Sequence, residues 1–455
     1  MYPNIIFFLI DGLRADQFYG NNRTCKTPNI DSLIKSGIYC EQAVSSTDGT
    51  IISLNTIFNS NFQVGNAANY QKLVLNQNNL IDVLKKNGYH IYGIFPNLTP
   101  FNSLQQYFEN EKNSFEWIEG NEPPETLSTG LAERITRVLE STEKQEPYFC
   151  YFHIFDLHPL REGKKSIGIE KFDDEEFGSS MYARTVSSID HWLGNILKKI
   201  DLEKTLLVIT SDHGERIPFE NKSHLDFQPE FDSAVKAGRK YLPRSLHTVG
   251  GKFSGKVKNT IGRVKQSSTN VGLTSYQKRS RDPYFTLSLF DELIRVPLLF
   301  VGTSIKPRII TKQVRHVDIF PTIFELIDIP LDITISGKSL VSAANEISEE
   351  EEPNYLHTMP YQKSSPLDRV GIRTGKHKYF RASQDSKKNV NLYDLENDPY
   401  ENNNIARSYK QLVVRLEKKM LGLEKDNLSK YKEEISDKEM QRITDELKRL
   451  GYINS

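Results

Sequence analysis

The chain has 455 residues, and its 59 Lys and Arg are matched by 59 Asp and Glu, so its formal net charge is zero. A protein devoted to nucleic acid would carry a large positive excess, so we expect no nucleic-acid partner. With 37% hydrophobic and 26% charged residues, the composition is that of a soluble globular protein and excludes disorder throughout.

Three cysteines, Cys25, Cys40 and Cys150, stand at unrelated spacings, so the sequence predicts neither a disulfide framework nor a cysteine-based zinc site. The first apolar run, from Ile5 to Ile10, is too short for a membrane span or a signal-peptide core, and it ends in an aspartate. We therefore expect a cytoplasmic protein, unless a targeting segment has been trimmed from the chain.

Short apolar runs and amphipathic segments alternate along the first half of the chain. The apolar runs, typical of strands buried on both faces, are 5–10, 91–95, 148–155 and 206–210. The amphipathic segments predict helices at 27–37, 80–87, 127–139 and 181–200. This alternation predicts an α/β domain with a doubly wound, mostly parallel sheet flanked by helices. Ligands of such sheets bind beyond the carboxyl ends of the strands, where the sequence has Asp11, Asp156, His158, Asp212 and His213.

Residues 233–281 differ from the rest of the chain because they hold twelve Lys or Arg residues and no Asp or Glu. Such a basic insertion is typical of a solvated loop. It also suits a lid or a docking surface for an anionic substrate, a partner or a membrane face.

The second half of the chain predicts a smaller unit. An apolar run at 296–301 indicates a further strand, and 318–327 indicates a helix. Turn-rich segments at 370–380 and 392–394 indicate a small antiparallel sheet, and helical spacing of Lys, Glu and Leu from 409 to 450 indicates surface helices. We expect a catalytic domain at 1–335 with the insertion at 233–281, a small C-terminal α+β subdomain at 336–408, and a helical tail at 409–455.

Two of the strand ends carry candidate metal ligands. Asp212 and His213 precede Gly214, which permits a turn that would bring the carboxylate and the imidazole to one cation. Asp11 ends the first strand at the same edge of the sheet. Each aspartate has a plainer alternative, because aspartate at such a position often caps a helix or forms a turn.

A hydroxyl-rich turn at 45–50 leads into the apolar segment 51–58. A threonine at a helix N-terminus, as Thr50 would be, lies near unpaired backbone N–H groups and the positive end of the helix dipole, which favours an anion. The alternative is helix capping by Ser46, Thr47, Asp48 or Thr50.

These pieces belong to an ordered series of short motifs: Ile10–Asp16, Thr27–Leu33, Thr50–Phe58, His153–Pro159, Ser211–Glu215, Phe290–Pro297, His316–Thr322, Gly371–Tyr379 and Leu392–Pro399. In this order they resemble the sulfatase branch of the alkaline phosphatase superfamily over nearly the whole chain. The resemblance implies that Asp11, Asp212 and His213 bind a metal ion and that Thr50 is both nucleophile and ligand. It also places His158, His153 and Asp156 on the substrate side of the pocket. A later substrate-contacting residue is expected after the Asp-His-Gly turn, where the nearest candidates are Lys222 and His224.

The chain departs from the family in two places. Active sulfatases carry Cys or Ser in a Cys-x-Pro-x-Arg turn and oxidise that residue to formylglycine, whereas this chain has Thr50-Ile-Ile-Ser-Leu54, and threonine cannot yield the aldehyde. Many sulfatases also have two aspartates after the first strand, where this chain has Asp11-Gly12. With one carboxylate fewer and His213 present, we expect one divalent ion, with Zn²⁺ or Mn²⁺ favoured over Ca²⁺ or Mg²⁺. A second ion, held by Asp156, His158 and His224, is left open.

The nucleophile position resembles that of the phosphoethanolamine transferases and related phosphodiesterases, which use threonine directly. We therefore predict a metal-dependent hydrolase or transferase that acts on phospho-esters through a covalent phosphothreonine at Thr50. The alternatives are a sulfuric-ester hydrolase and a catalytically silent relative that binds an anionic glycan or lipid. The expected partner is an anionic ester such as a glycan, a lipid head group or a sugar phosphate.

Overall fold

The computed structural model describes residues 2–21, 23–64, 72–116, 125–142, 144–161, 166–217, 274–281, 288–302, 305–343, 352–359 and 367–427. The chain forms two compact units, one made of Met1–Arg216 with Phe285–Ser455 and the other of Ile217–Tyr284. In the second unit the structure describes one helix, α11 (Ser275–Arg281). Most of the basic insertion at 233–281 therefore lies outside the described residues.

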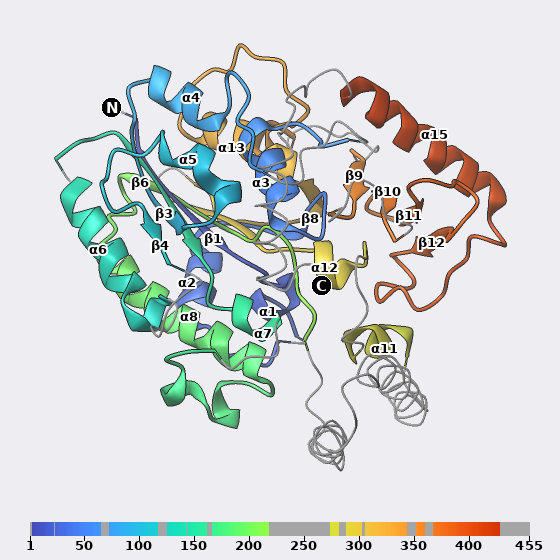
Figure 1. Ribbon diagram of the computed structural model, residues 1–455, viewed down its shortest axis with the longest axis horizontal. Helices are drawn as coiled ribbons and strands as arrows, with labels where there is room; N and C mark the ends of the chain where they lie inside the picture. The colour runs from blue at the N-terminus through green and yellow to red at the C-terminus, as the bar shows by residue number, and fades with distance from the viewer. Residues whose placement is uncertain are drawn as a thin grey trace, which may run out of the picture. The chain divides into compact units, whose positions relative to one another are not determined.

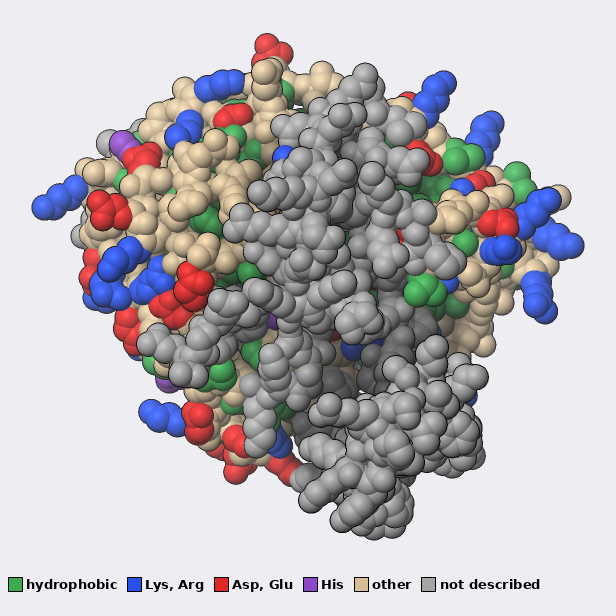
Figure 2. Space-filling model, in the orientation of Figure 1, with side chains coloured by type: hydrophobic (Ala, Val, Ile, Leu, Met, Phe, Trp, Pro, Cys, Tyr) green, Lys and Arg blue, Asp and Glu red, His purple; other side chains and the backbone are tan. Residues whose placement is uncertain are grey.

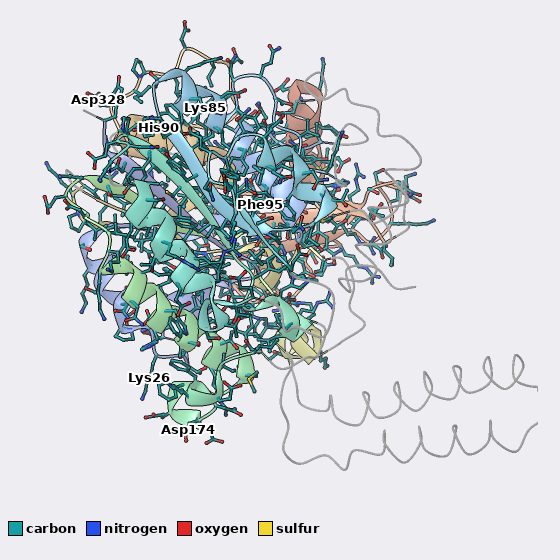
Figure 3. All side chains as sticks on the ribbon, turned by 60° about the vertical axis from the view of Figure 1, so that its left-hand side comes forward. Lys26, Lys85, His90, Phe95, Asp174 and Asp328 are labelled. Atoms are coloured by element: carbon teal, nitrogen blue, oxygen red, sulfur yellow. The ribbon has the colours of Figure 1, made fainter. Side chains whose placement is uncertain are left out.

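The first unit is built on an eight-stranded sheet in the order β4-β3-β5-β1-β6-β7-β2-β8 (Figure 1). Its strands are β1 (Asn4–Ile10), β2 (Ile38–Val44), β3 (His90–Pro96), β4 (Ser114–Phe115), β5 (Tyr148–Ile154), β6 (Thr205–Thr210), β7 (Leu298–Val301) and β8 (Arg308–Arg315). All pairings are parallel except those of β7 with β6 and with β2. In Figure 3, His90 and Phe95 mark the start and the end of β3 and so show the direction of the parallel strands.

The centre of the sheet is the most apolar part of the sequence. Ile5 to Ile10 in β1 are at most 1% exposed, because β5 and β6 flank the strand and helices cover both faces. Helices α2, α6 and α8 gather on one side and α3, α4 and α13 on the other (Figure 1). This arrangement confirms the predicted α/β fold with a doubly wound, mostly parallel sheet.

The helices and short 3₁₀ turns of this unit connect the strands. They are α1 (Ala15–Phe18), α2 (Pro28–Ser36), α3 (Thr50–Asn59), α4 (Leu80–Lys86), η2 (Thr99–Phe101), α5 (Asn102–Gln105), η3 (Leu127–Thr129), α6 (Leu131–Thr142), α7 (His158–Arg161), η4 (Glu170–Phe172), η5 (Glu175–Phe177), α8 (Met181–Leu197), α12 (Asp291–Ile294), η7 (His316–Asp318), α13 (Ile319–Leu326) and α14 (Leu340–Ala343). The helix expected at 127–139 is split into η3 and α6, because Gly130 between them has a φ of 134°.

A second sheet has four antiparallel strands in the order β12-β11-β10-β9. The strands are β9 (Asn354–His357), β10 (Arg369–Arg373), β11 (His377–Ala382) and β12 (Asn391–Asp394), and α15 (Lys410–Asn427) follows them. One face packs on α15 through a core that includes Tyr355, Tyr379 and Met420. The other face carries Leu356 and Phe380 into a cluster with Val44 of β2, which joins the small sheet to the large one.

The surface around α15 mixes charged and apolar side chains. Figure 2 shows Lys and Arg side chains on the side of the molecule where α15 and the small sheet lie. Among the described residues, no helix is both long enough and apolar enough to cross a membrane. The predicted domain boundaries at 335 and 408 and the cytoplasmic location remain predictions.

Candidate functional site

The candidate site lies at the carboxyl end of the eight-stranded sheet, where β1 and β6 are neighbours. Asp11 follows β1 directly, and Asp212 and His213 come just after β6. These three residues are at most 1% exposed. One ligand atom from each lies within 4.8 Å of the other two, which is close enough to hold a single cation. The structure therefore brings together the three side chains that the resemblance names as metal ligands.

The ring of His213 is oriented for binding a cation. Its Nδ1 lies 2.6 Å from the carbonyl oxygen of Gly214. Because a carbonyl can only accept, Nδ1 carries the hydrogen, and in the neutral ring Nε2 keeps its lone pair. That Nε2 lies 3.5 Å from Asp212 Oδ2 and 3.4 Å from Thr50 Oγ1. A histidine held in this way presents a nitrogen ligand to the cluster.

Thr50 is the first residue of α3, and its hydroxyl lies against this cluster. Thr50 Oγ1 is 3.2 Å from Asp11 Oδ2, and the residue is 4% exposed. The backbone N–H groups at the start of a ten-residue helix point to the same place and favour negative charge there. The N-cap of α3 is Gly49, so none of the four residues considered as caps occupies that position.

Two histidines from the β5 side approach Asp11. His158 Nδ1 lies 3.4 Å from Asp11 Oδ1, and His153 Nε2 lies 3.8 Å from Asp11 Oδ2. Tyr151 places its hydroxyl 3.1 Å from His153 Nδ1 and so orients that ring. The ring of His158 stacks on Phe155, with centroids 4.5 Å apart. Both histidines thus contact the cluster through Asp11.

The two carboxyl groups of the cluster are perturbed in opposite directions. Burial alone would raise the pKa of Asp11, but hydrogen bonds from His153 and His158 and the charges of His158 and His213 hold that pKa well below its usual range. Burial and the nearby charge of Asp11 raise the pKa of Asp212. Two buried carboxylates this close repel each other, and a bound cation would relieve the repulsion.

The donor set fits a divalent metal ion. Asp212 Oδ2 is buried and accepts no hydrogen bond from the part of the chain that the structure describes. An unsatisfied carboxylate oxygen in such a place costs free energy unless a cation binds there. Two carboxylates, one imidazole nitrogen and the Thr50 hydroxyl form a mixed N/O set of the kind that divalent transition metals accept.

The turns that hold these ligands depend on two glycines. Gly12 has a φ of +69°, which glycine adopts without strain, so the residue after Asp11 stands where few side chains are tolerated. At Gly214 the reason is space, because a Cβ there would lie 2.2 Å from the backbone oxygen of Glu292. The backbone N–H of Gly214 donates to the Leu293 carbonyl at 2.8 Å, and this bond fixes the loop after His213.

Not every predicted residue reaches the cluster. Asp156 accepts hydrogen bonds from the Leu127 N–H at 3.1 and 3.3 Å, so its carboxylate holds the start of η3. The structure gives it no contact with the metal cluster, and its role in substrate binding remains a prediction. Lys222 and His224 lie outside the described residues, so the suggested second site of Asp156, His158 and His224 is also untested.

Sequence reasoning missed several residues that shape the site. Ser211 Oγ accepts from the Leu13 N–H at 2.8 Å and donates to the His213 carbonyl at 2.6 Å, which ties the two ligand loops together. Tyr182 of α8 donates to the Gly12 carbonyl at 2.6 Å. His316, which is buried beside α3, lies 3.0 Å from Ser53 Oγ, and burial lowers its pKa to about 3. The motif order signalled Ser211 and His316, but nothing in the sequence pattern signalled Tyr182.

Comparison with known proteins places this geometry in context. The sulfatase family pattern matches residues 3–329, and the C-terminal pattern of N-sulphoglucosamine sulphohydrolase matches residues 284–426. Arylsulfatase K of Mus musculus is 28% identical over 147 residues, which cover 31% of this chain and 27% of that relative. The match therefore spans only about a quarter of that curated relative's length.

Two solved structures share the fold. One is a protein in complex with its substrate D-glucosamine-2-N,6-O-disulfate, with a TM-score of 0.61, 16% identity and coverage of 94% of this chain and 99% of that chain. The other is the phosphonate monoester hydrolase of Agrobacterium radiobacter, with a TM-score of 0.60, 16% identity and coverage of 93% and 96%. Because the sulfatase pattern covers well over half of the sequence, the chain belongs to the sulfatase family.

Proposed function

We propose that this chain is a metal-dependent hydrolase that cleaves an ester of a tetrahedral oxyanion at the cluster of Asp11, Thr50, Asp212 and His213. The observation that supports it most directly is the position of Thr50 Oγ1. This oxygen is buried at the N-terminus of α3, 3.2 Å from Asp11 Oδ2 and 3.4 Å from His213 Nε2. A hydroxyl among metal-type ligands at a helix N-terminus suits a nucleophile that attacks an anionic ester.

The chemistry divides between the metal and the protein. When bound, a divalent ion lowers the pKa of the Thr50 hydroxyl and neutralises charge on the non-bridging oxygens of the ester. Asp11, Asp212 and His213 hold that ion, with Zn²⁺ or Mn²⁺ as the expected metals. His158 and His153 keep Asp11 ionised, and the substrate-side role that the resemblance implies for them would let them contact the ester or protonate the leaving oxygen.

A phospho-ester is the substrate that the threonine itself favours. The Thr50 hydroxyl gives up its proton as its oxygen bonds to phosphorus, the bond from phosphorus to the ester oxygen breaks, and that oxygen leaves with a proton. Water then splits the phosphothreonine, which restores Thr50 and releases phosphate from a monoester or a phosphate monoester from a diester. A sulfothreonine lacks the elimination route that a formylglycine hydrate offers, so its turnover would be slow. The shared fold with a phosphonate monoester hydrolase is compatible with phosphorus chemistry.

A sulfuric ester is the second candidate, and the comparisons favour it over the phospho-ester. The chain belongs to the sulfatase family, curated relatives include an arylsulfatase, and one structural neighbour is in complex with its substrate, a sulfated glucosamine. The structural neighbours solved with a glucosamine disulfate and with a carrageenan oligosaccharide also support an anionic glycan as the substrate. The two candidates share the same site and differ in the central atom of the ester.

One experiment tests both candidates. The metal-loaded protein is assayed side by side on an aryl sulfate, an aryl phosphate monoester and an aryl phosphodiester, and the preferred substrate identifies the central atom. We expect Thr50→Ala to lower kcat by at least about a thousandfold on that substrate while elemental analysis finds unchanged metal content. Thr56→Ala is the matched control, because Thr56 is buried in the same helix and its hydroxyl donates only to the Ile52 carbonyl at 2.8 Å.

The outcomes are distinct. Equal activity of Thr50→Ala and Thr56→Ala would rule out a nucleophilic threonine. A wild-type protein that turns over none of the three esters but binds a sulfated oligosaccharide would be the catalytically silent relative.

A further inference from the structure

The turn that leads into Thr50 is held by the C-terminal part of the chain. Residues 354–359 run beside the turn at 45–49, where Asn354 Nδ2 donates to the Ser45 carbonyl at 3.0 Å. The His357 N–H donates to the Ser46 carbonyl at 2.9 Å. Through these bonds β9 pairs with the turn at 45–49, which leads into Thr50. Yet β9 belongs to the small sheet and supplies none of the three clustered ligands.

Asp48 joins this turn to two distant segments through its carboxylate. Its Oδ1 accepts from the Met359 N–H at 2.8 Å, and its Oδ2 accepts from the Ser288 N–H at 2.9 Å. The residue is 6% exposed, so these charge-assisted bonds form in a place largely closed to water. One side chain thus fixes the turn to chain segments 240 and 311 residues further along.

Gly49 brings the same segment into contact with the start of α3. A Cβ at Gly49 would lie 2.3 Å from Met359 Sδ and 2.8 Å from Met359 Cβ. Met359 therefore packs directly on the N-cap residue of α3, one residue before Thr50. A shift of this segment moves the backbone that carries Thr50. Because the N-cap residue is a glycine, it has no side chain that could bond to the helix and resist the shift.

We propose that Asp48 is a positioning residue that holds Thr50 Oγ1 against Asp11 and His213 by binding the Met359 and Ser288 N–H groups. The proposal rests on the proposed function, because it gives Thr50 a role in the reaction. It connects the C-terminal sheet to the position of Thr50 through the backbone N–H of Met359, beside the packing of the Met359 side chain on Gly49. Misplacing a reacting atom by about 1 Å can cost a hundredfold in rate, so a fixed turn has a measurable effect.

The test compares Asp48→Asn with Asp190→Asn in the full-length, metal-loaded protein. Asp190 is a matched control because it is 1% exposed and its carboxylate also accepts two backbone N–H groups, from Ile30 at 2.8 Å and Asn29 at 3.3 Å. In either variant the amide keeps one acceptor oxygen and loses the other. Both should therefore lower the melting temperature, and only Asp48→Asn should lower kcat per folded molecule, by ten- to a hundredfold with KM within about twofold.

Met359→Ala separates the hydrogen bond from packing. It keeps the backbone N–H that binds Asp48, so its kcat should fall less than that of Asp48→Asn. Equal kcat values for Asp48→Asn and Asp190→Asn, each corrected for the folded fraction, would overturn the proposal.

A second measurement needs no turnover and so separates this proposal from the proposed function. Orthovanadate binds as a mimic of the attacked centre, and its dissociation constant in the metal-loaded protein reports where Thr50 Oγ1 lies. We expect Asp48→Asn to raise that constant about tenfold and Asp190→Asn to leave it unchanged. If the wild type turns over none of the three esters, the vanadate dissociation constants of the two variants still decide for or against the positioning role of Asp48. A wild type that binds no vanadate also counts against that role.

Discussion

At the end of the eight-stranded sheet, charged side chains surround Asp212 Oδ2, a buried carboxylate oxygen that accepts no hydrogen bond from the described residues. At the four-stranded sheet, by contrast, the charged side chains pair with each other. At the large sheet, Asp11 and Asp212 lie together with His213, and in the part of the chain that the structure describes only histidines, and no Lys or Arg, pair with these two carboxylates. At the small sheet, Lys378 is fully buried and lies 2.5 Å from Asp291 Oδ1 and 2.8 Å from Glu401 Oε1. Arg373 adds a third contact, 2.8 Å from Asp291 Oδ2.

The difference separates a binding site from a structural joint. Carboxylates that no Lys or Arg neutralises can accept an external cation, so we propose the large sheet as the place where a metal and an anionic ester would bind. Carboxylates already neutralised by Lys378 and Arg373 have no such capacity and instead fix α12 to the small sheet. The charges of Arg373 and Lys378 outweigh burial and hold the pKa of Asp291 well below its usual range. We expect variants of the two regions to fail in different ways.

The largest effect on stability should come from Lys378→Met. Removing this cation takes the Lys378 ion pair away from the buried carboxylate of Glu401, and the loss of one member of a buried ion pair typically costs about 3–5 kcal/mol. The free energy of unfolding is measured by chemical denaturation, with Lys388→Met as the control. Lys388 is 75% exposed and lies 3.5 Å from Asp385, so its loss should change stability by less than about 1 kcal/mol. Similar stabilities for the two variants would contradict the structural role of the buried pair.

A pH-dependent effect is expected at Asp156, at the large sheet. Burial raises the pKa of Asp156 to about 7, above the value of about 4 in an unfolded chain. The folded protein thus binds more protons than the unfolded chain between about pH 4 and 7, and over this window stability falls as pH rises, by at most about 1.4 kcal/mol per pH unit.

Asp156→Asn removes this slope and keeps an oxygen for the Leu127 N–H. Relative to wild type, the variant should gain stability from pH 5 to pH 8 when unfolding is measured in the presence of a chelator. Asp201→Asn, at an aspartate with a 57% exposed side chain, should follow the wild-type curve. An unchanged slope in Asp156→Asn would show that this carboxyl is not the group that titrates.

His158→Ala should weaken metal binding without unfolding the protein. His158 contacts Asp11 Oδ1 at 3.4 Å, and loss of such a supporting residue typically lowers metal affinity ten- to a hundredfold. Calorimetric titration with Zn²⁺ and with Mn²⁺ gives the affinity. His90→Ala is the control, because His90 pairs with Glu109 at 2.8 Å on the surface, where its side chain is 45% exposed. Equal affinities for the two variants would remove His158 from the site.

The sequence revealed the central strands well and the edge strands poorly. The runs at 5–10, 148–155 and 206–210 are almost entirely apolar because β1, β5 and β6 are buried on both faces. β8 was missed, because it is an edge strand with polar residues that face water, and its hydrophobic signal is weak. β9 was missed because its four residues mix polar and apolar side chains that are all buried.

The same contrast applies to the site. Asp11, Thr50, Asp212 and His213 could be proposed from the sequence because each stands at the end of a recognisable element and the family order links them. Asp156 has the same position after a strand, yet its side chain turns to η3, and the position alone does not give that direction. Asp48 was considered only as a cap, since its partners lie 240 and 311 residues away and no local pattern signals them.

We expect the smallest effect on stability from Gly12→Asp, and this variant tests most directly which metal ion the site prefers. The variant restores the second aspartate that many sulfatases carry after the first strand. A Cβ at Gly12 would meet Glu215 and His213 at 3.6 Å or more, so the site has room. The φ of +69° is strained for most side chains at about 1–2 kcal/mol, although aspartate tolerates it better than most.

We expect the metal-free variant to be less stable than wild type by about 1 kcal/mol and its preference to move from Zn²⁺ or Mn²⁺ toward Ca²⁺, because a third carboxylate adds a hard oxygen ligand. Gly12→Ala carries the same backbone strain without the carboxylate, so it should lose stability and keep the wild-type metal preference. If Ca²⁺ stabilises both variants equally in thermal unfolding, the missing carboxylate does not set the choice of metal.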